Sequence, residues 1–351
     1  MPPAFLKPAL QGFQPYVPGE QPGDGEGWVK LNTNESPFPP SSRVLEALRS
    51  AIGESLRLYP SPTAAPARAA IAAQLEIRPD CVTLGNGGDE LIAMCFRAFV
   101  PARAAVAFPT PSYPLFDPLC AIHESTPSRH ALDGEWRLPS SLAADPAPLK
   151  FVVNPNSPTG SWYSAEEVEP IVRDSAGVVV VDEAYVDFAP ASLLNLTERH
   201  PNLLILRTMS KSYSLAGLRI GFAVGQPDLV AALDSVKDSY NLDRLAIVAA
   251  VAAVQDRHHH DELVRFVVAE RDWLTSQLTA IGFDVEPSAA NFLFTRPPAD
   301  LPAEHVWREL RRRRILVRHY TQSPIAGWLR VTVGTRDQHQ QLLEALGEMV
   351  G

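Results

Sequence analysis

The chain has 351 residues, of which 46% are hydrophobic and 20% are charged, and its formal net charge at pH 7 is −9. A chain of this length can bury a large core and is expected to form two domains. The negative charge argues against nucleic acid or an anionic membrane as the main partner, and no apolar run is long enough to span a bilayer.

The first part of the chain changes from an extended pattern to alternating strands and helices. Residues 1–40 are rich in proline and glycine, which predicts an extended arm, and a helical pattern begins at Ser41. Beyond residue 80, continuous apolar runs indicate strands buried on both faces, as in a mostly parallel sheet covered by helices. The expected strands are residues 82–84, 105–108, 151–153, 178–181, 203–206 and 220–224.

The last third of the chain has a different pattern. Residues 227–280 are typical of long helices with a boundary between 240 and 260, and a final helix is expected from Asp337. Short strands (283–285, 292–294, 315–317 and 329–333) surround a helix at 305–313. We therefore predict an α/β protein with a smaller α+β domain. The expected division is an N-terminal arm with part of the small domain (1–45), a large domain (46–250) and a small C-terminal domain (251–351).

The cysteine pattern indicates a reducing compartment. Cys81, Cys95 and Cys120 form no C-x-x-C pair and lie in apolar stretches, so we expect buried free thiols. Residues 1–30 hold no apolar core of signal-peptide length. These features predict a cytoplasmic protein.

Three loops that follow expected strands carry ligand-binding residue types. The loop at 85–90 reads Gly-Asn-Gly-Gly-Asp-Glu and opens a helix, so its backbone amides favour a phosphate. The loop at 109–113 ends in Tyr113, which can stack on a planar cofactor. The loop at 154–160 reads Asn-Pro-Asn-Ser-Pro-Thr-Gly and presents amide and hydroxyl donors, with a candidate cis X-Pro bond. Each signal is weak alone, because glycine-rich turns and half-buried loop tyrosines are common.

A carboxylate follows the next strand. Asp182 ends the run of four valines at 178–181, at the sheet edge where ligands bind in open α/β folds. A buried carboxylate needs a positive partner, and a protonated pyridine nitrogen would serve. Tyr185, three residues on, could reach the phenolic oxygen of the same ring.

Lys211 follows the strand at 203–206 and carries the sharpest chemical signal. A lysine held in a rigid loop can form an imine with an aldehyde cofactor. Ser210 and Arg219, on either side of it, can together hold a phosphate dianion. An ordinary solvated lysine is the simpler interpretation of Lys211 alone, but not of five such segments in order along one sheet.

With these segments, the chain resembles the pyridoxal-phosphate enzymes of the aspartate-aminotransferase fold (fold type I). Within them it resembles the histidinol-phosphate aminotransferase family, of class II. The resemblance covers almost the whole chain and includes the Asp182 and Lys211 segments and residues 14–19, 31–37, 58–60, 240–241, 291–292, 317–318 and 329–335. The Lys211 segment is highly specific for the superfamily, and the Tyr16 and Arg330 segments favour the histidinol-phosphate branch more weakly.

The resemblance implies a role for each site residue. It implies that Lys211 bonds to pyridoxal 5'-phosphate and moves the substrate proton, that Asp182 keeps the pyridinium protonated, and that Tyr185 donates to the ring oxygen O3′. Other implied cofactor contacts are Gly88, Asp89, Tyr113, Asn154, Asn156, Ser157, Thr208, Ser210, Arg219 and, from the second subunit of a homodimer, Tyr59. Implied substrate contacts are Tyr16, Asn34, Arg318 and Arg330.

One residue departs from the family pattern. Members usually carry asparagine directly before Pro-Thr-Gly, where it hydrogen-bonds the cofactor O3′, and this chain has Ser157. Either the serine hydroxyl takes this role, directly or through water, or Asn154 or Asn156 replaces it. We expect the tuning of the cofactor to differ and the chemistry to persist.

The function that the resemblance implies is amino transfer from histidinol phosphate to 2-oxoglutarate in histidine biosynthesis. A broad aromatic amino-acid aminotransferase and a decarboxylase of phosphorylated amino acids, such as threonine phosphate, share the same motifs. A sensor domain of a transcription regulator is disfavoured by the acidic charge and by the lack of sequence for a DNA-binding module. The arginines at 311–314 point around a helix, and the histidines at 258–260 lack the spacing of a metal site, so no metal is expected.

Overall fold

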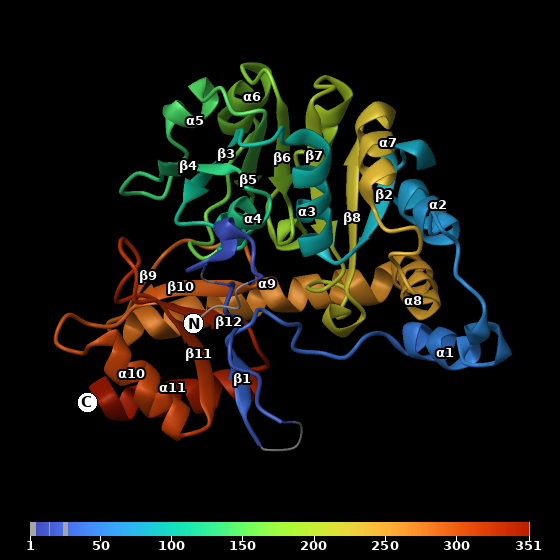
Figure 1. Ribbon diagram of the computed structural model, residues 1–351. Helices are drawn as coiled ribbons and strands as arrows, with labels where there is room; N and C mark the ends of the chain where they lie inside the picture. The colour runs from blue at the N-terminus through green and yellow to red at the C-terminus, as the bar shows by residue number, and fades with distance from the viewer. Residues whose placement is uncertain (1–4, 14, 24–26, 351) are drawn as a thin grey trace.

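The computed structural model describes residues 5–13, 15–23 and 27–350, which form two sheets with the long helix α9 passing beside them (Figure 1). The larger sheet has the strand order β2-β8-β7-β6-β5-β3-β4. Its strands are β2 (Val82–Asn86), β3 (Ala105–Thr110), β4 (Thr126–Ala131), β5 (Leu149–Val153), β6 (Val178–Asp182), β7 (Leu203–Thr208) and β8 (Ile220–Gly225). Its pairs are parallel except those of β8, which runs antiparallel to both of its neighbours.

Helices cover both faces of the larger sheet. They are α2 (Ala65–Gln74), α3 (Gly88–Phe99), α4 (Phe116–Ile122), α5 (Ser140–Ala144), α6 (Ala165–Arg173), α7 (Pro227–Val236) and α8 (Arg244–Gln255), and α1 (Ser42–Ala51) packs against α8. Along β6, Val180 packs in the apolar cluster with α3 and α4, whereas Val179 and Val181 pack in the cluster with α5 and α6. Burial on both faces explains why the valine run is uninterrupted, and it confirms the predicted α/β architecture.

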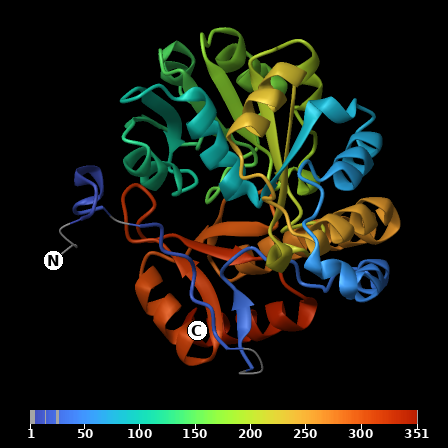
Figure 2. The same ribbon diagram turned by 45° about the vertical axis from the view of Figure 1, so that its right-hand side comes forward.

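The smaller sheet has the order β1-β11-β12-β10-β9. Its strands are β1 (Val29–Leu31), β9 (Asp284–Val285), β10 (Phe292–Arg296), β11 (Ile315–His319) and β12 (Leu329–Thr332). Its helices are α9 (Arg257–Ala280), α10 (Ala303–Arg312) and α11 (Arg336–Val350). The N-terminal segment passes across this sheet before β1 pairs in parallel with β11 at its edge (Figure 2).

Short 3-10 helices complete the described elements. They are η1 (Pro8–Leu10), η2 (Glu54–Arg57), η3 (Pro79–Cys81), η4 (Val186–Phe188), η5 (Leu194–Glu198) and η6 (Ala216–Leu218). In the described part of the chain, no helix is both long and apolar enough to cross a membrane.

The structure contains every strand that the sequence predicts in the larger sheet, and the predicted helix boundary falls between α8 and α9. Two strands are not predicted, β1 and β4. The central residue of β1 is Lys30, and β4 is a partly exposed edge strand, so neither carries a continuous apolar run. The division at residues 45 and 250 stays a prediction.

Candidate active site

A cavity of about 360 Å³ lies where strands β6 and β7 end, and residues of the smaller sheet also line it. Fourteen of the site residues predicted from the sequence line this cavity. They are Tyr16, Asn34, Gly88, Asp89, Tyr113, Ser157, Asp182, Tyr185, Thr208, Ser210, Lys211, Arg219, Arg318 and Arg330. Three nominated residues do not line it, namely Tyr59, Asn154 and Asn156.

Lys211 lies in the loop after β7, and its Nζ donates to the backbone oxygen of Thr33 at 3.3 Å. The same Nζ lies 5.6 Å from the centre of the Tyr185 ring. Burial and, next in importance, the nearby Arg330 guanidinium lower the pKa of the Lys211 amine from 10.5 to about 8. A larger fraction of this amine is therefore neutral near pH 7 than of an exposed lysine.

Asp182 is the last residue of β6, and its Oδ1 accepts a hydrogen bond from the backbone N–H of Ala184 at 3.0 Å. Burial raises the pKa of this carboxyl to about 7. Among the residues that the structure describes, no cationic side chain forms an ion pair with it. The site therefore holds a carboxylate that a cationic ligand would stabilise.

Tyr185 is fixed by contacts from distant parts of the chain. Its hydroxyl accepts from Nδ2 of Asn34 at 3.0 Å, and its ring packs edge-on against Phe292 at 5.1 Å. Asn34 has a positive φ of 55°, and its backbone N–H donates to Oγ1 of Thr332 at 2.9 Å. The N-terminal segment thus connects Tyr185 to the smaller sheet.

The N-terminus of α3 and the residues around β8 form a compact polar cradle. The Tyr113 hydroxyl donates to Oδ1 of Asp89 at 2.8 Å, and Nη2 of Arg219 lies 3.3 Å from Oδ2 of the same carboxylate. Gly87 has a φ of 83°, and a Cβ added there would lie 2.6 Å from Nη2 of Arg219. Thr208 Oγ1 donates to Ser210 Oγ at 2.9 Å on the neighbouring loop. Backbone amides, hydroxyls and a guanidinium at a helix N-terminus suit a phosphate group.

Two arginines lie on the neighbouring antiparallel strands β11 and β12, where Arg318 is paired directly with Arg330. Arg330 donates through Nη1 to Ser157 Oγ at 3.1 Å and through Nη2 to the backbone oxygen of Asn32 at 3.0 Å. Its Nε is buried and has no partner among the described residues. Burial raises the pKa of Tyr16, against the opposing influence of both guanidinium groups. This end of the cavity therefore suits an anion.

The loop at 154–160 uses the side chains of its two asparagines within the protein itself. The amide of Asn154 exchanges two hydrogen bonds of 2.8 Å with the backbone of Tyr163. The amide of Asn156 donates to the backbone oxygen of Pro111 at 3.1 Å and accepts from Ser112. Both asparagines are buried and do not line the cavity, because their amides hold the loop together, so their predicted role in place of the amide missing at Ser157 gains no support from this geometry.

Tyr59 also lies outside this cavity. Its side chain is 78% exposed, and its ring stacks on Tyr240 at 4.4 Å. Tyr59 does not line the cavity of its own chain, and its exposure leaves it accessible to another molecule.

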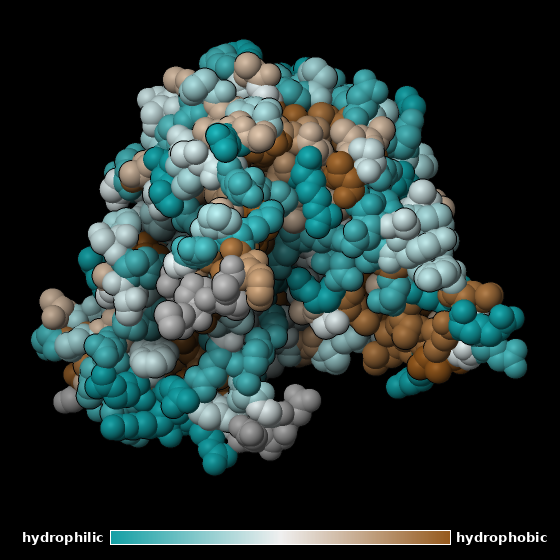
Figure 3. All heavy atoms as spheres, in the orientation of Figure 1, coloured by the Kyte–Doolittle hydropathy of each residue, from teal (hydrophilic) through white to brown (hydrophobic). Residues whose placement is uncertain are grey.

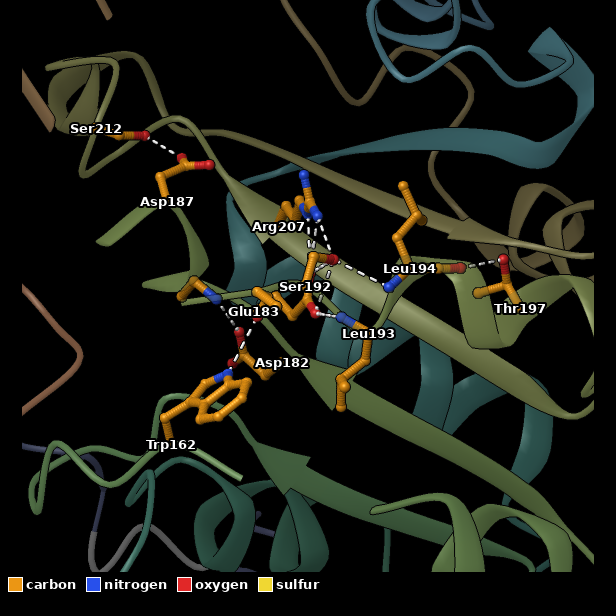
Figure 4. A network of polar contacts seen from close by, with 12 residues as sticks. Trp162, Asp182, Glu183, Asp187, Ser192, Leu193, Leu194, Thr197, Arg207 and Ser212 are labelled. Atoms are coloured by element: carbon orange, nitrogen blue, oxygen red, sulfur yellow. Dashed lines mark hydrogen bonds and ion pairs between the residues drawn. The ribbon is translucent and has the colours of Figure 1, made fainter. Parts of the chain in front are cut away.

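Glu183 follows Asp182 but does not line the cavity, and it lies in a polar network with Ser192, Leu193 and Arg207 (Figure 4). Its carboxylate is within 2.9 Å of Nη2 of Arg207 and accepts hydrogen bonds from the hydroxyl of Ser192 and the backbone of Leu193. The two acids are therefore not a catalytic pair, as the alternation of strand residues predicts.

Several lining residues were not nominated from the sequence. Among them are Asn32, Thr33, Asp117, Tyr320, Gln322, Ser323 and Ile325. Asn32 and Thr33 lie in the 31–37 segment that supports the resemblance, whereas the loop between β11 and β12 carries no motif. Only the pairing of these strands places that loop at the cavity.

The sequence of this chain is similar to those of known aminotransferases. The model of aminotransferase class I and II matches residues 26–346. Histidinol-phosphate aminotransferase 1 of Pseudomonas fluorescens (strain Pf0-1) is 42% identical over 349 residues, which cover 98% of this chain and 99% of the relative. The histidinol-phosphate aminotransferase of Aromatoleum aromaticum is 45% identical over 356 residues, with 99% of each chain covered.

A solved structure agrees with these relatives. Histidinol-phosphate aminotransferase from Sinorhizobium meliloti, in complex with pyridoxal-5'-phosphate, superposes with a TM-score of 0.90 at 27% identity, over 99% of this chain and 98% of that one. These similarities confirm the resemblance and the fold expected from the sequence. The chain belongs to the class I and II aminotransferase family, within the group of histidinol-phosphate aminotransferases.

Proposed function

We propose that the protein is a pyridoxal-phosphate-dependent aminotransferase that moves an amino group from histidinol phosphate to 2-oxoglutarate in histidine biosynthesis. The main observation in support is that Lys211, Asp182 and the Arg318–Arg330 pair line one cavity. The relatives in Pseudomonas fluorescens and Aromatoleum aromaticum, named for histidinol phosphate, support this donor.

The residues present fit this cofactor. The carboxylate of Asp182 has no cationic partner among the described residues and would hold the protonated ring nitrogen. The cradle of Gly88, Asp89, Thr208, Ser210 and Arg219 would hold the phosphate. When bound, the cofactor supplies an aldehyde and a ring that withdraws electrons from the substrate carbon.

The side chains of the cavity divide the remaining tasks. Lys211 would bond to the cofactor through Nζ and, once released, its neutral amine would accept the proton of the substrate carbon and return it. Tyr185, held by Asn34, would hydrogen-bond the ring oxygen, and Tyr113 would stack on the ring. Ser157 also lines the cavity, and its hydroxyl accepts a hydrogen bond from Arg330.

Arg318 and Arg330 would bind the anionic end of each substrate, with Tyr16 and Asn34 beside them. A guanidinium group forms bidentate hydrogen bonds with phosphates and carboxylates alike. One subsite can therefore serve the phosphate of the donor and the distal carboxylate of the acceptor in alternate half-reactions.

A homodimer with shared active sites is part of the proposal. Tyr59 would reach the cofactor phosphate of the second subunit. Next to it, Ile52, Leu56 and Leu58 are exposed apolar side chains. Hydrophobic surface extends over α1 and α8 (Figure 3), where a groove is lined by Ala47, Ile247 and Val251 among others. We also propose a cytoplasmic location, which the three free cysteines support.

Parallel assays of the purified protein test the proposed reaction. Histidinol phosphate, phenylalanine, tyrosine and threonine phosphate are each supplied with 2-oxoglutarate, and glutamate and CO2 are measured. We expect the highest kcat/KM with histidinol phosphate. Preference for the aromatic acids would indicate the broad aromatic aminotransferase, and CO2 release would indicate the decarboxylase.

Replacement of Lys211 tests the covalent step. Lys211→Ala should lower turnover by at least about a thousandfold, and borohydride reduction should no longer attach the cofactor to the chain. Lys150→Met is the matched control, because Lys150 is also buried but donates to the backbone oxygen of Ala143 outside the cavity. An adduct mapped by mass spectrometry to another lysine of the native protein would refute the assignment.

A further inference from the structure

The face of the smaller sheet that carries the two cavity arginines also carries Tyr320. Arg318 is paired with Arg330, and the backbone N–H of Tyr320 donates to the oxygen of Trp328 at 3.3 Å, which continues the same antiparallel register. Residues opposite each other, and residues two apart on one strand, project from the same face. Tyr320 therefore lies beside the guanidinium groups and lines the same cavity.

An aromatic cluster holds Tyr320 in place. Its ring packs against Phe294 at 6.1 Å, and Phe294 stacks on Trp328 at 4.5 Å with nearly parallel planes. Trp136, which follows strand β4 of the larger sheet, packs edge-on against Phe294 and Trp328, each at 6.0 Å. Ring contacts therefore fix the phenol of Tyr320. Its hydroxyl makes no hydrogen bond within the part of the chain that the structure describes.

The charges around Tyr320 are those of the anion subsite. Burial raises its pKa, and the guanidinium groups of Arg330 and Arg318 are the leading influences that oppose the rise. The phenols of Tyr16 and Tyr185 also act on it. The hydroxyl thus stays protonated near neutral pH and remains a hydrogen-bond donor among positive groups.

We propose that Tyr320 is a further substrate-binding residue, whose hydroxyl donates to the phosphate of the amino donor. The inference rests on the proposed function and deepens it. A phosphate monoester has three peripheral oxygens, whereas a carboxylate has two, so the phosphate can use a donor beyond the arginine pair. Tyr320 therefore favours the phosphorylated donor over substrates that present a carboxylate.

Equilibrium binding of two dead-end ligands tests this role without turnover. The ligands are imidazolylpropyl phosphate, which is histidinol phosphate without its amino group, and the corresponding unphosphorylated alcohol. Tyr320→Phe keeps the ring contact with Phe294 and removes only the hydroxyl. Its Kd for the phosphate, measured by calorimetry on the cofactor-loaded protein, should rise about tenfold to a hundredfold, as for a lost hydrogen bond to a charged group. Its Kd for the alcohol should not change.

Steady-state kinetics give a second readout. KM for histidinol phosphate should rise in Tyr320→Phe with kcat nearly unchanged, and KM for 2-oxoglutarate should rise much less. Tyr163→Phe is the matched control. The Tyr163 hydroxyl is buried outside the cavity and donates to the backbone oxygen of Trp136 at 2.9 Å. This control should lower stability and leave both Kd values unchanged.

The outcomes separate this inference from the proposed function. An unchanged Kd for the phosphate, or an equal loss for the phosphate and the alcohol, would overturn the role of Tyr320. If the native protein does not transfer the amino group of histidinol phosphate, the proposed donor is wrong. The ratio of the two Kd values still decides whether the Tyr320 hydroxyl recognises a phosphate.

Discussion

Asp182 and Lys211 enter one cavity from the ends of the neighbouring strands β6 and β7, and burial moves their pKa values toward each other. The pKa of the carboxyl rises to about 7 and that of the amine falls to about 8. Burial therefore favours the neutral form of each group until a ligand provides a compensating charge or bond. The pair is arranged to hold a cation at one point and to react with an electrophile at another.

The pH dependence of cofactor attachment tests the state of Lys211. Only the neutral amine attacks an aldehyde, so the attachment rate in cofactor-free protein should rise with pH and level off above a midpoint near 8, not near the ordinary value of 10.5. Arg330→Gln should move this midpoint upward, because the Arg330 guanidinium helps to lower the pKa. Stopped-flow absorbance after mixing with pyridoxal phosphate measures the rate. A native midpoint near 10.5 would contradict the burial argument.

Asp182 is expected to destabilise the cofactor-free protein. Its folded pKa of about 7 lies above the ordinary 3.8, so the folded chain binds the proton more tightly than the unfolded chain. The free energy of unfolding should therefore fall as pH rises from 3.8 to about 7, and the loss is complete above that pH. At pH 8, Asp182→Asn should make the cofactor-free protein more stable by up to a few kcal/mol and bind the cofactor more weakly.

Urea unfolding with and without cofactor measures both effects of Asp182→Asn. Asp174→Asn is the control, because Asp174 is an exposed carboxylate paired with Arg173. The control should show no gain in stability at pH 8. If the native protein and Asp182→Asn are equally stable at that pH without cofactor, burial of the charged Asp182 carboxylate does not destabilise the fold.

The buried ion pair of Glu183 and Arg207 should stabilise the fold next to strand β6, which ends at Asp182. The Glu183 residue is 1% exposed, so Arg207→Met would leave a buried charge without its cation. We expect a loss of about 3–5 kcal/mol in the free energy of unfolding. The double variant Glu183→Gln with Arg207→Met should recover much of that loss, because it removes the unpaired charge as well.

Arg199→Met provides the comparison for this pair. Arg199 forms an exposed ion pair with Glu169, so its replacement should cost less than about 1 kcal/mol. Chemical denaturation of the single and double variants gives the coupling energy. Strictly additive losses for the buried pair would argue against this account.

Mixed dimers test whether Tyr59 acts on the second subunit. Tyr59→Phe should weaken cofactor binding, and Lys211→Ala should abolish turnover. If Tyr59 acts across the interface, a dimer with one subunit of each variant contains one fully native site. Mixing the two variants at limiting cofactor should therefore restore activity above that of either alone. No restoration in verified mixed dimers would place Tyr59 in the site of its own chain or outside both.

Much of the cofactor side of the site could be predicted from the sequence. Asp182 follows a run of valines, and Lys211 follows the next strand, so a parallel sheet must bring them to one edge. The distinction among Asn154, Asn156 and Ser157 could not be predicted. All three lie in one short loop, and only the folded loop shows which side chains its own backbone uses.

The sequence by itself determined the alternation of strands and helices, the position of Lys211 after its strand and the glycine-rich turn before α3, because each depends on neighbouring residues. The tertiary structure decided that β1 joins the smaller sheet, that Arg318 faces Arg330, and that Tyr320 enters the same cavity. These relationships join segments distant along the chain or depend on strand register, and register is set by packing between elements, which a local pattern does not encode.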